Sequence, residues 1–369
     1  MTEPGPAEVN ALLMGIQAAR DRGDGRAIVV AELEFQASAC DVVGSPLYGH
    51  LLRRAAQDAR AGGATWEIMG GHAADPPFTA LALRLMAAVH RLVLTGKAPG
   101  LAHHYASAGG TEGLLGADEA FIGVLRDNLE ELRSGVARPC QTNEPARSAA
   151  LVGGFLTVAR VTGLPLRILE VGASAGLNLR WDHFRYEHDQ LAWGPPRSPV
   201  TLAGVFESPP PLEVGAVVLE RQGCDPNPQD PALEETRLNL MASAWADQVE
   251  RFRTLEGALQ VARQVPAVVD RADGAGWAEQ QLSIPRPGVA TVVYHSIVMQ
   301  YMNDAGRARF AEVVTSAGER ATAEAPVAWL SFEPGDGERA HVHLTTWPGG
   351  GKRLVATAGY HGRPVRWLG

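Results

Sequence analysis

The sequence predicts an α/β protein in which a helical N-terminal domain precedes a mostly parallel sheet covered by helices on both faces. Residues 7–150 carry apolar side chains at helical spacing, with capping residues and glycines between the segments. From about residue 150 onward, short apolar strand segments alternate with longer helical ones, an order typical of parallel sheets. The stretch 341–368 indicates two strands joined by a glycine-rich turn and one last short strand, which predicts an antiparallel C-terminal edge. We therefore expect a helical domain at residues 1–140 and an α/β core at residues 141–369.

The helices of the first domain are predicted from the residues at their ends. They are expected at residues 45–63, 76–96 and 118–135. Ser45 and Pro46 combine a capping residue with a first-turn proline. The second segment has prolines before it and a glycine after it. Asp118 and Glu119 open the third segment with the negative charge that a helix start favours.

The strands of the core are predicted from short apolar runs. Strands are expected at residues 166–171, 216–225, 289–297 and 326–333, with helices at residues 231–264 and 304–320. Between the first two strands, residues 184–204 alternate aromatic and polar side chains around a Gly-Pro-Pro turn, which predicts a hairpin insertion. Ligands of such sheets bind at the carboxyl ends of the strands, so we expect the functional site there.

Composition excludes several classes of partner. The 369-residue chain has a net charge of −8, whereas binding to nucleic acid needs a concentrated basic surface. No apolar run reaches the length of a membrane span, and the N-terminus lacks a basic, apolar signal sequence. Cys40, Cys140 and Cys224 are scattered and form no CxxC pair, so neither a disulfide framework nor a metal site is indicated. We expect a cytoplasmic protein with no nucleic-acid or membrane partner.

A glycine-containing turn follows the first core strand in residues 167–178, RILEVGASAGLN. Gly172 permits a tight turn, Ala173 and Ser174 are small enough for close backbone approach, and Gly176 lets a helix begin. The head of that helix would offer unpaired amides and a partial positive charge to a ligand carboxylate. Glu170, at the strand end, would face the cationic part of the ligand. This pattern favours a cofactor turn.

The same turn allows two other interpretations. Its G-x-S-x-G spacing fits the nucleophile elbow of α/β-hydrolases, with Ser174 as the nucleophile. Asp225 or Asp270 and then His295 or His361 follow in the chain order of a triad. Against this stands the acid at the buried strand end, because an unpaired buried charge is costly. A tight turn that binds nothing also remains open, since a glycine pattern alone is weak evidence.

Beyond the turn, several stretches resemble a bacterial, chiefly actinobacterial, family of uncharacterised proteins with a methyltransferase-like core. They include SPLYGHLL, AAVHRLVLTG, QTNEPARSAAL, LEVGASAGLNLRWDHFRYE, RQGCDPNPQD, SAWADQVERFRTLEGAL, VVYHSIVMQYM and YHGRPVRWL. The resemblance covers about residues 35–369. It implies a Rossmann-like sheet of the type found in S-adenosylmethionine (SAM)-dependent methyltransferases, and it argues against a hydrolase. Because fold alone does not give function, it supplies no activity.

The resemblance implies SAM as cofactor and assigns a set of residues to its binding. They are Glu170, Gly172, Ala173, Ser174, Gly176, Asn178 and Asp225. Ser174 stands where many methyltransferases have the middle glycine of the turn. Asp225, the candidate for the ribose hydroxyls, comes 49 residues after Gly176 because the insertion intervenes. A turn-capping aspartate is the alternative for Asp225.

Further polar residues are candidates for catalysis and substrate contact. His295 is expected as a general base and Tyr301 as a hydrogen-bonding group across the pocket, with packing at a strand end as the alternative. The candidate substrate contacts are Asn143, Glu144, Arg147, Asp41, Ser45 and Tyr48. For Ser45, helix capping is the alternative.

Three functions follow from these features. The first is a SAM-dependent methyltransferase acting on a small molecule, in which positioning does most of the catalysis. The second keeps the fold but catalyses another substitution or a cyclisation without consuming SAM. The third is a non-catalytic ligand-binding or partner subunit. A protein partner or a homo-oligomer is compatible with each of them.

Overall fold

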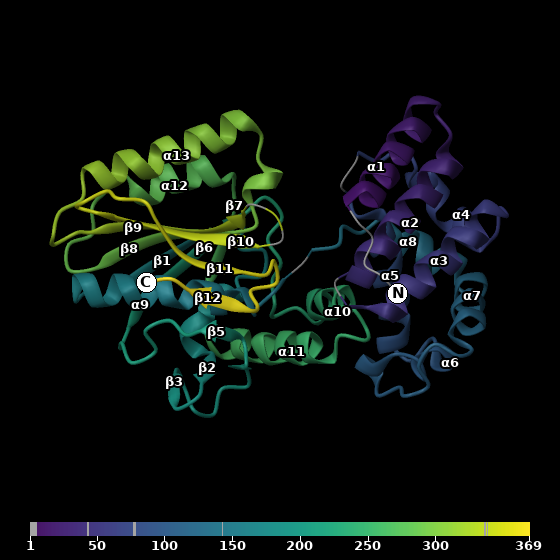
Figure 1. Ribbon diagram of the computed structural model, residues 1–369, viewed down its shortest axis with the longest axis horizontal. Coiled ribbons are helices and arrows are strands. Elements are labelled where there is room, and N and C mark those ends of the chain that lie inside the picture. The colour runs from purple at the N-terminus through teal and green to yellow at the C-terminus, as the bar shows by residue number, and fades with distance from the viewer. Residues whose placement is uncertain (1–5, 43, 77–78, 142, 336, 338) are drawn as a thin grey trace. The chain divides into compact units, whose positions relative to one another are not determined.

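The computed structural model describes residues 6–42, 44–76, 79–141, 143–335, 337 and 339–369. It divides into two compact units, which we call unit 1 and unit 2 (Figure 1). Unit 1 consists of residues 1–142 and 237–253, and unit 2 of residues 143–236 and 254–369. The first boundary lies two residues beyond the predicted one at residue 140, whereas the return of residues 237–253 to the helical unit was not predicted.

Unit 1 is helical. Its helices are α1 (Pro6–Asp21), α2 (Gly25–Val42), α3 (Pro46–Arg60), α4 (Ala64–Met69), α5 (Leu81–Leu94), α6 (Pro99–Ala102), α7 (Ala117–Asp127) and α8 (Leu129–Val136). One predicted helix, at residues 118–135, is interrupted at Asn128, where φ is −129° and ψ is 32°. The Asn128 side chain donates to the carbonyl of Val124 at 2.9 Å. Such a local bond competes with the helix backbone, which explains the interruption.

The start of α3 is held by an aspartate from the returning segment. Ser45 occupies the N-cap position as predicted, but its side chain makes no capping bond to the helix backbone. Its hydroxyl instead donates to Oδ1 of Asp247 at 2.5 Å, and the amide of Leu47 donates to Oδ2 at 3.0 Å. Asp247 therefore satisfies an amide that the helix start leaves without an intrahelical partner.

Unit 2 is built on one large sheet, which contains nine strands among the described residues, in the order β5-β12-β11-β10-β9-β8-β1-β6-β7. The strands are β1 (Leu166–Val171), β5 (Phe206–Ser208), β6 (Val218–Asp225), β7 (Val268–Arg271), β8 (Ala290–Ser296), β9 (Val327–Pro334), β10 (Ala340–Trp347), β11 (Arg353–Ala358) and β12 (Val365–Trp367). The run from β7 to β9 is parallel. β10 and β11 pair antiparallel, as predicted for the C-terminal edge.

The order of the parallel strands locates the reversal point of the sheet. Numbered along the chain, the strands β1, β6, β7, β8 and β9 lie in the order 3-2-1-4-5. Doubly wound sheets share this order and bind ligands outside the carboxyl ends of the strands, where the order reverses. In unit 2 that point lies between β1 and β8.

Helices cover both faces of the sheet. α12 (Gly274–Leu282) and α13 (Asp304–Glu319) lie on one face, and α9 (Arg147–Thr162) lies on the other (Figure 1). Because side chains alternate along a strand, Leu169 and Val171 of β1 face α12 and α13 and belong to the same apolar core as residues of those helices. Glu170, between them, faces the α9 side.

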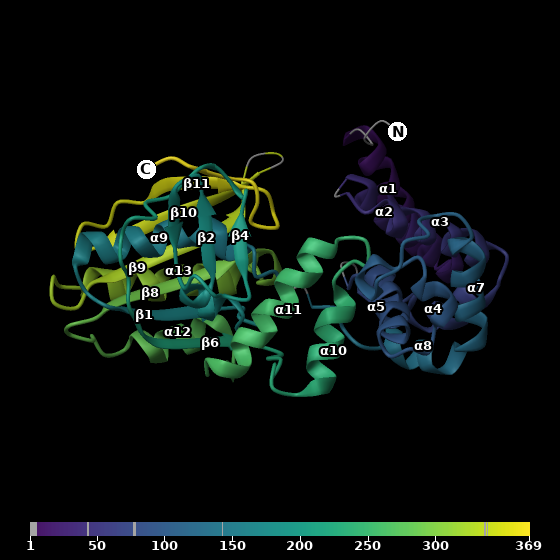
Figure 2. The same ribbon diagram turned by 90° about the horizontal axis from the view of Figure 1, so that it is seen from below.

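The insertion after β1 forms a small sheet on the α9 side (Figure 2). In the continuously described stretch 143–335 it has three strands, β2 (Arg185–His188), β3 (Leu191–Trp193) and β4 (Thr201–Ala203). β2 and β3 form the predicted hairpin, and β4 adds a parallel third strand. Trp181 stacks between Phe155 of α9 and Trp193 of β3, with ring centroids 4.6 and 4.9 Å away. This stack fixes the insertion to the core.

Several parts of the core differ from the prediction. The helix predicted at residues 231–264 is divided into α10 (Glu234–Ser243) and α11 (Val249–Gln264). β7 and α12 were not predicted, because their short, mixed sequences give weak periodicity. The structure has no helix, among the described residues, that is long and apolar enough to cross a membrane.

We predict that Asp247→Ala destabilises unit 1 by about 1–2 kcal/mol, since the amide of Leu47 and the fully buried Ser45 hydroxyl both lose their acceptor. Urea unfolding and hydrogen exchange of the α3 amides measure the effect. Asp127→Ala, at an exposed position of α7, is the control and is expected to change stability by less than about 0.5 kcal/mol. Equal protection of the α3 amides in both variants would contradict the capping role.

Candidate functional site

A cluster of polar side chains lies at the carboxyl ends of β1, β6 and β8, where the strand order reverses. We call it the carboxyl-edge cluster. It comprises Asn143, Glu144, Arg147, Glu170, Ser174, Asn178 and Asp225, all in unit 2. All seven were predicted as ligand contacts, from three separate stretches of sequence. The structure therefore brings these residues together.

The turn after β1 is held by backbone bonds and left-handed residues. Gly172 and Gly176 have φ values of 75° and 64°, which favour glycine. The amides of Gly172 and Ala173 donate to the carbonyl of Cys224, at the end of the neighbouring strand β6, at 2.9 and 3.0 Å. The amide of Gly176 donates to the carbonyl of Ala173 at 2.7 Å. The small residues of this turn thus allow the backbone to follow this tightly bonded path.

The next amides of the turn are bonded to side chains of the protein. The amide of Ser174 donates to Oδ2 of Asp225 at 2.9 Å, and the amide of Ala175 donates to Oδ1 of Asn143 at 3.1 Å. These are the amides expected to receive the negative end of a ligand. Asp225 and Asn143 occupy that place in this structure.

The prediction of an α-helix after the turn is wrong. Residues Asn178–His183 form a short 3-10 helix, η3, with non-helical angles at Arg180. The Arg180 guanidinium donates to the carbonyl of Gly176 at 2.6 Å, the carbonyl that an α-helical bond from the Arg180 amide would use. The Arg180 amide donates instead to Leu177, at 3.2 Å. One side chain therefore replaces the helical bond, and in the described stretch 143–335 the turn after β1 leads into a short 3-10 helix in place of an α-helix.

Ser174 is a strained residue with satisfied polar groups. Its φ of 49° lies in the left-handed region, which costs a non-glycine residue on the order of 1 kcal/mol. Its hydroxyl accepts from Nδ2 of Asn143 at 2.9 Å, and its carbonyl accepts from the amide of Gln229 at 3.1 Å. Asp225 also accepts from the amide of Asn227 at 2.8 Å. This bond supports the turn-capping alternative for Asp225.

Glu170 is the buried acid of the cluster. It is 2% exposed, and its Oε2 has no hydrogen-bond partner among the described residues. Burial raises the pKa of Glu170 to about 8, and the charge of Asp225 adds to the rise. The nearby Tyr294 hydroxyl and the charges of Arg180 and Arg147 lower the pKa in part. The Tyr294 hydroxyl also has no partner of normal geometry in the described chain, so the two groups approach each other without a formed hydrogen bond.

The cations near Glu170 are bonded elsewhere. Arg180 donates to backbone carbonyls, including that of Val265 at 2.8 Å. Arg147, at the start of α9, donates to the carbonyl of Ser296 at 3.2 Å and to that of Tyr360 at 3.2 Å. Within the described residues Glu170 has no ion pair of its own. A buried carboxyl in this position needs a proton or an added cation.

The strand register places Tyr294 beside Glu170. Glu170 of β1 pairs with Tyr294 of β8 in a parallel ladder, so their side chains share the α9 face of the sheet. Tyr294 is fully buried, and its ring meets Phe155 edge-on at 5.1 Å. The carboxyl and the phenol therefore share an apolar surrounding.

Glu144 and the C-terminal turn border the cluster. Glu144 is 3% exposed, and its Oε2 lies 3.5 Å from Nδ1 of His361. Asn178 donates to the carbonyl of Glu144 at 3.3 Å, while its own Oδ1 is buried with no partner in the described part of the chain. Residues predicted to contact the cofactor and residues predicted to contact the substrate thus belong to one buried polar cluster.

The loop after β8 packs against the glycine turn. A Cβ at Gly172 would lie 2.3 Å from Cγ2 of Val298, so glycine is required there by the neighbouring side chain. Ile297 has a φ of 54°, an unfavourable value for a β-branched residue. Glu333 accepts from the amide of Val298 at 2.9 Å and holds this strained loop in place.

His295 faces the opposite side of the sheet and is 1% exposed. Trp329 Nε1 donates to Nε2 of His295 at 3.0 Å, which requires Nε2 to be unprotonated. Nδ1 then carries the proton and donates to Glu333 at 2.6 Å. Both ring nitrogens are occupied, which supports the packing alternative over a general base. Tyr301 is 76% exposed at the surface and does not reach across the cluster.

The other three predicted substrate contacts lie in unit 1. Asp41 forms an ion pair with Arg53, and Ser45 is bonded to Asp247. Tyr48 is 1% exposed, and its hydroxyl has no partner among the residues described. For Ser45, a role at the helix start agrees with the capping alternative.

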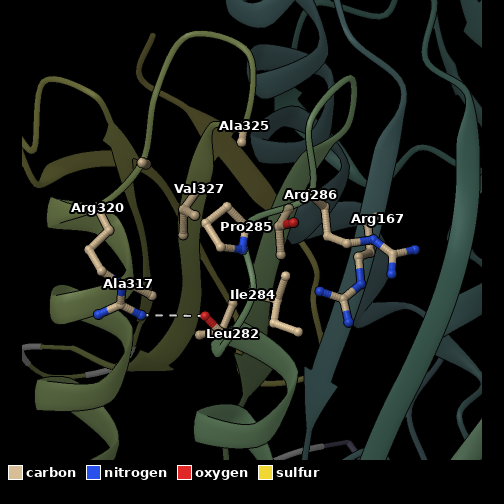
Figure 3. A pocket seen from close by; sticks show the side chains of 11 residues that line it. Arg167, Leu282, Ile284, Pro285, Arg286, Ala317, Arg320, Ala325 and Val327 are labelled. Atoms are coloured by element: carbon tan, nitrogen blue, oxygen red, sulfur yellow. Dashed lines mark hydrogen bonds between the residues drawn. The ribbon is translucent and has the colours of Figure 1, made fainter.

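A separate small pocket opens at the other edge of the sheet, at the amino ends of β1, β8 and β9 (Figure 3). Arg167 and Arg320 line it and donate to carbonyls at the C-terminus of α12, those of Gln281 at 3.1 Å and Leu282 at 3.4 Å. Cations at helix C-termini are stabilising there, so these arginines have a structural role. Among the described residues, no group of three or more His, Cys, Asp or Glu residues is placed to hold a metal ion.

Sequence analysis missed two members of the buried surroundings, Tyr294 and Arg180. Tyr294 directly precedes His295, and strand alternation implies that only one of the two faces Glu170. The register between β1 and β8 decides which one, and the sequence does not encode it locally. Arg180 lies in a stretch predicted as helical, where an arginine is expected on the surface.

We predict that the stability of the protein falls between about pH 4.5 and pH 8 because Glu170 is protonated in the folded state and ionised in the unfolded state over this range. Glu170→Gln removes this dependence, so the variant should gain about 3–5 kcal/mol on the wild type from pH 4.5 to pH 8. Urea unfolding across this range measures it. Glu256→Gln, at an exposed position of α11, removes an equal charge and is expected to follow the wild type. Parallel pH profiles for wild type and Glu170→Gln would exclude a buried neutral carboxyl.

Comparison with known proteins gives a family and no activity. Neither the curated proteins nor the solved structures contain a match to the chain. A family model described as an uncharacterized protein conserved in bacteria (DUF2332) matches residues 30–367. The chain therefore belongs to the bacterial family DUF2332.

Proposed function

We propose that unit 2 binds a small cationic molecule at the carboxyl-edge cluster, with Glu170 as its counter-ion, and that the protein is a SAM-dependent methyltransferase acting on a small molecule. The observation that carries the proposal is the unpaired Oε2 of Glu170, 2% exposed, beside the reversal point of a doubly wound sheet. Strongly shifted carboxyls at such positions are candidates for function.

An added cation would resolve the electrostatic cost of this carboxyl. Burying an unpaired carboxyl is unfavourable, and the raised pKa expresses this by keeping the proton on. A ligand cation within about 4–6 Å would favour the ionised form and displace the proton. The charges of Arg180 and Arg147 lower the pKa of Glu170 only in part; Arg180 donates its hydrogen bonds to carbonyls, and Arg147 donates to the carbonyls of Ser296 and Tyr360.

SAM fits part of this arrangement. Its sulfonium and ammonium groups suit Glu170, and the strand order 3-2-1-4-5 supports a Rossmann-like sheet of the methyltransferase type. When bound, SAM would supply the methyl group, while Glu170 would anchor the cation. Asp225 lies at the end of β6. Each of its carboxylate oxygens accepts one hydrogen bond and has a further lone pair that could accept from a ribose hydroxyl.

The second candidate is an enzyme of the same fold that catalyses another substitution or a cyclisation without consuming SAM. The hydrogen bonds that the turn after β1 already makes to side chains favour this second candidate. The amides of Ser174 and Ala175 are bonded to Asp225 and Asn143, so they offer nothing to the carboxylate of a methionine moiety. Val298 also occupies the space above Gly172. A cationic ligand of another shape would still satisfy Glu170.

We predict that SAM binds with release of a proton. At pH 7 a carboxyl of pKa about 8 is mostly protonated, so a cation that ionises Glu170 should release roughly 0.9 proton per molecule bound. Titration calorimetry of the full chain with SAM, in buffers of different ionisation enthalpy, measures the number released. Glu170→Gln should weaken binding at least about tenfold and abolish the release, while Glu256→Gln should do neither.

The outcomes separate the candidates. Micromolar SAM binding with proton release supports the methyltransferase proposal. No heat with SAM or with its demethylated product at millimolar concentration would exclude it and leave the second candidate. Tight SAM binding that is unchanged by Glu170→Gln would contradict the role of Glu170 while keeping the cofactor.

A further inference from the structure

A serine and a histidine form a close pair in unit 1. Ser107, in the 3-10 helix η2 (Ala106–Ala108), lies with its Oγ 2.7 Å from Nε2 of His90. Ser107 is partly exposed, whereas His90 of α5 is fully buried. A serine hydroxyl within hydrogen-bond distance of an imidazole nitrogen is the arrangement of a nucleophile and its base.

The tautomer of His90 is fixed by two carbonyls. Nδ1 of His90 lies 3.1 Å from the carbonyl of Ala242 and 2.9 Å from that of Ala244. Carbonyls only accept, so Nδ1 carries the proton and Nε2 is bare. The Ser107 hydroxyl must then donate to Nε2. Burial lowers the pKa of His90 to about 4, so the ring is neutral near neutral pH and its Nε2 lone pair is available, but the same burial disfavours the imidazolium and makes His90 a weaker base than an exposed histidine.

In a Ser-His-Asp triad the aspartate accepts the Nδ1 proton of the histidine, and here the carbonyls of Ala242 and Ala244 accept it. A third group that orients the base completes the nucleophile–base pattern. Carbonyls hold the ring and its tautomer, but they lack the full negative charge that stabilises an imidazolium in Ser-His-Asp sites. Activation is therefore expected to be weaker than in such a triad, although the proton path is the same.

Two tyrosine hydroxyls in the core of unit 1 have no hydrogen-bond partner among the described residues, whereas the backbone amides after Ser107 are all bonded. The amides of Ala108, Gly109 and Gly110, which follow Ser107, are bonded within the turn. The hydroxyls of Tyr48 and Tyr105 are buried and have no partner among the described residues. Burial raises the pKa of both phenols, so both remain O–H donors. The Tyr105 ring packs edge-on against His90, with centroids 5.4 Å apart.

We propose that Ser107 is an activated nucleophile with His90 as its base, and that unit 1 carries an acyl-transfer site for small carboxylic esters. Ser107 Oγ attacks the ester carbonyl carbon, and its proton passes to Nε2 of His90. As the tetrahedral intermediate collapses, the carbon–oxygen bond to the alcohol breaks, and the alcohol leaves with that proton. Water then hydrolyses the acyl-serine, again with His90 as the base. This site is independent of the function proposed for unit 2.

A fluorophosphonate probe tests the proposal without knowledge of the natural ester. Ser107 Oγ attacks phosphorus, the phosphorus–fluorine bond breaks, fluoride leaves and His90 takes the proton. Intact-mass and peptide analysis of the full chain should find one adduct, on Ser107, in the native protein. Ser107→Ala should abolish the adduct, and Ser38→Ala, at a partly buried serine of α2, should leave it unchanged.

The dependence on His90 is tested in two ways. His90→Gln should lower the labelling rate roughly 10²-fold or more, the usual contribution of a general base. Because a core substitution can unfold unit 1, the wild type is also labelled in urea, where the adduct should disappear. No adduct on Ser107 in the native protein, or equal labelling of Ser107 in native and unfolded chains, would overturn the proposal.

Discussion

The carboxyl of Glu170 is the constraint on which the organisation of unit 2 depends. It lies one residue before the end of strand β1, faces α9 and is removed from water without an ion pair among the described residues. Removing a carboxylate from water without a partner is costly, so the group keeps its proton unless a cation arrives. Arg180, the cation with the largest effect on the pKa of Glu170, donates its hydrogen bonds to carbonyls and lowers that pKa only in part. The result is a buried carboxyl that is neutral in the folded protein and that, in the proposed function, takes a ligand cation as its partner.

The turn after β1 shows how side chains replace a secondary-structure element. In place of a helix N-terminus, Asp225 and Asn143 accept the exposed amides, and the Arg180 guanidinium takes a carbonyl that would continue the helix. These bonds hold Ser174 in a left-handed conformation that its sequence alone would disfavour. The consequence for function is specific. In the proposed function the positive end of a ligand would meet the buried acid, whereas the amides of Ser174 and Ala175 are already bonded to Asp225 and Asn143.

Much of the architecture could be predicted from sequence periodicity, and the details of the site could not. The alternation of strands and helices gave the mostly parallel sheet, and the tail gave the antiparallel edge, since both signals are local. The contacts that cap α3 and orient His90 come from residues 237–253, far away in sequence. The register between β1 and β8 decides whether Tyr294 or His295 faces the same side of the sheet as Glu170, and this register depends on the whole sheet. Glu170, Ser174, Asn178 and Asp225 were predicted from their places at strand ends and from the family resemblance. Asn143, Glu144 and Arg147 were predicted as a polar stretch before the helix that leads into the core. The bonds among all seven residues of the carboxyl-edge cluster depend on tertiary packing.

The most direct test of this account is the titration of Glu170 itself. Carbon-13 NMR of glutamate-labelled protein, with Glu170→Gln used to assign the resonance, follows the carboxyl carbon from pH 4 to pH 9. The account predicts a midpoint near 8 in the free protein, because burial raises the pKa to about 8. A midpoint below about 5 would mean that the carboxylate is ionised and solvated in the folded protein, and it would contradict the claim that unit 2 holds a buried acid awaiting a cation.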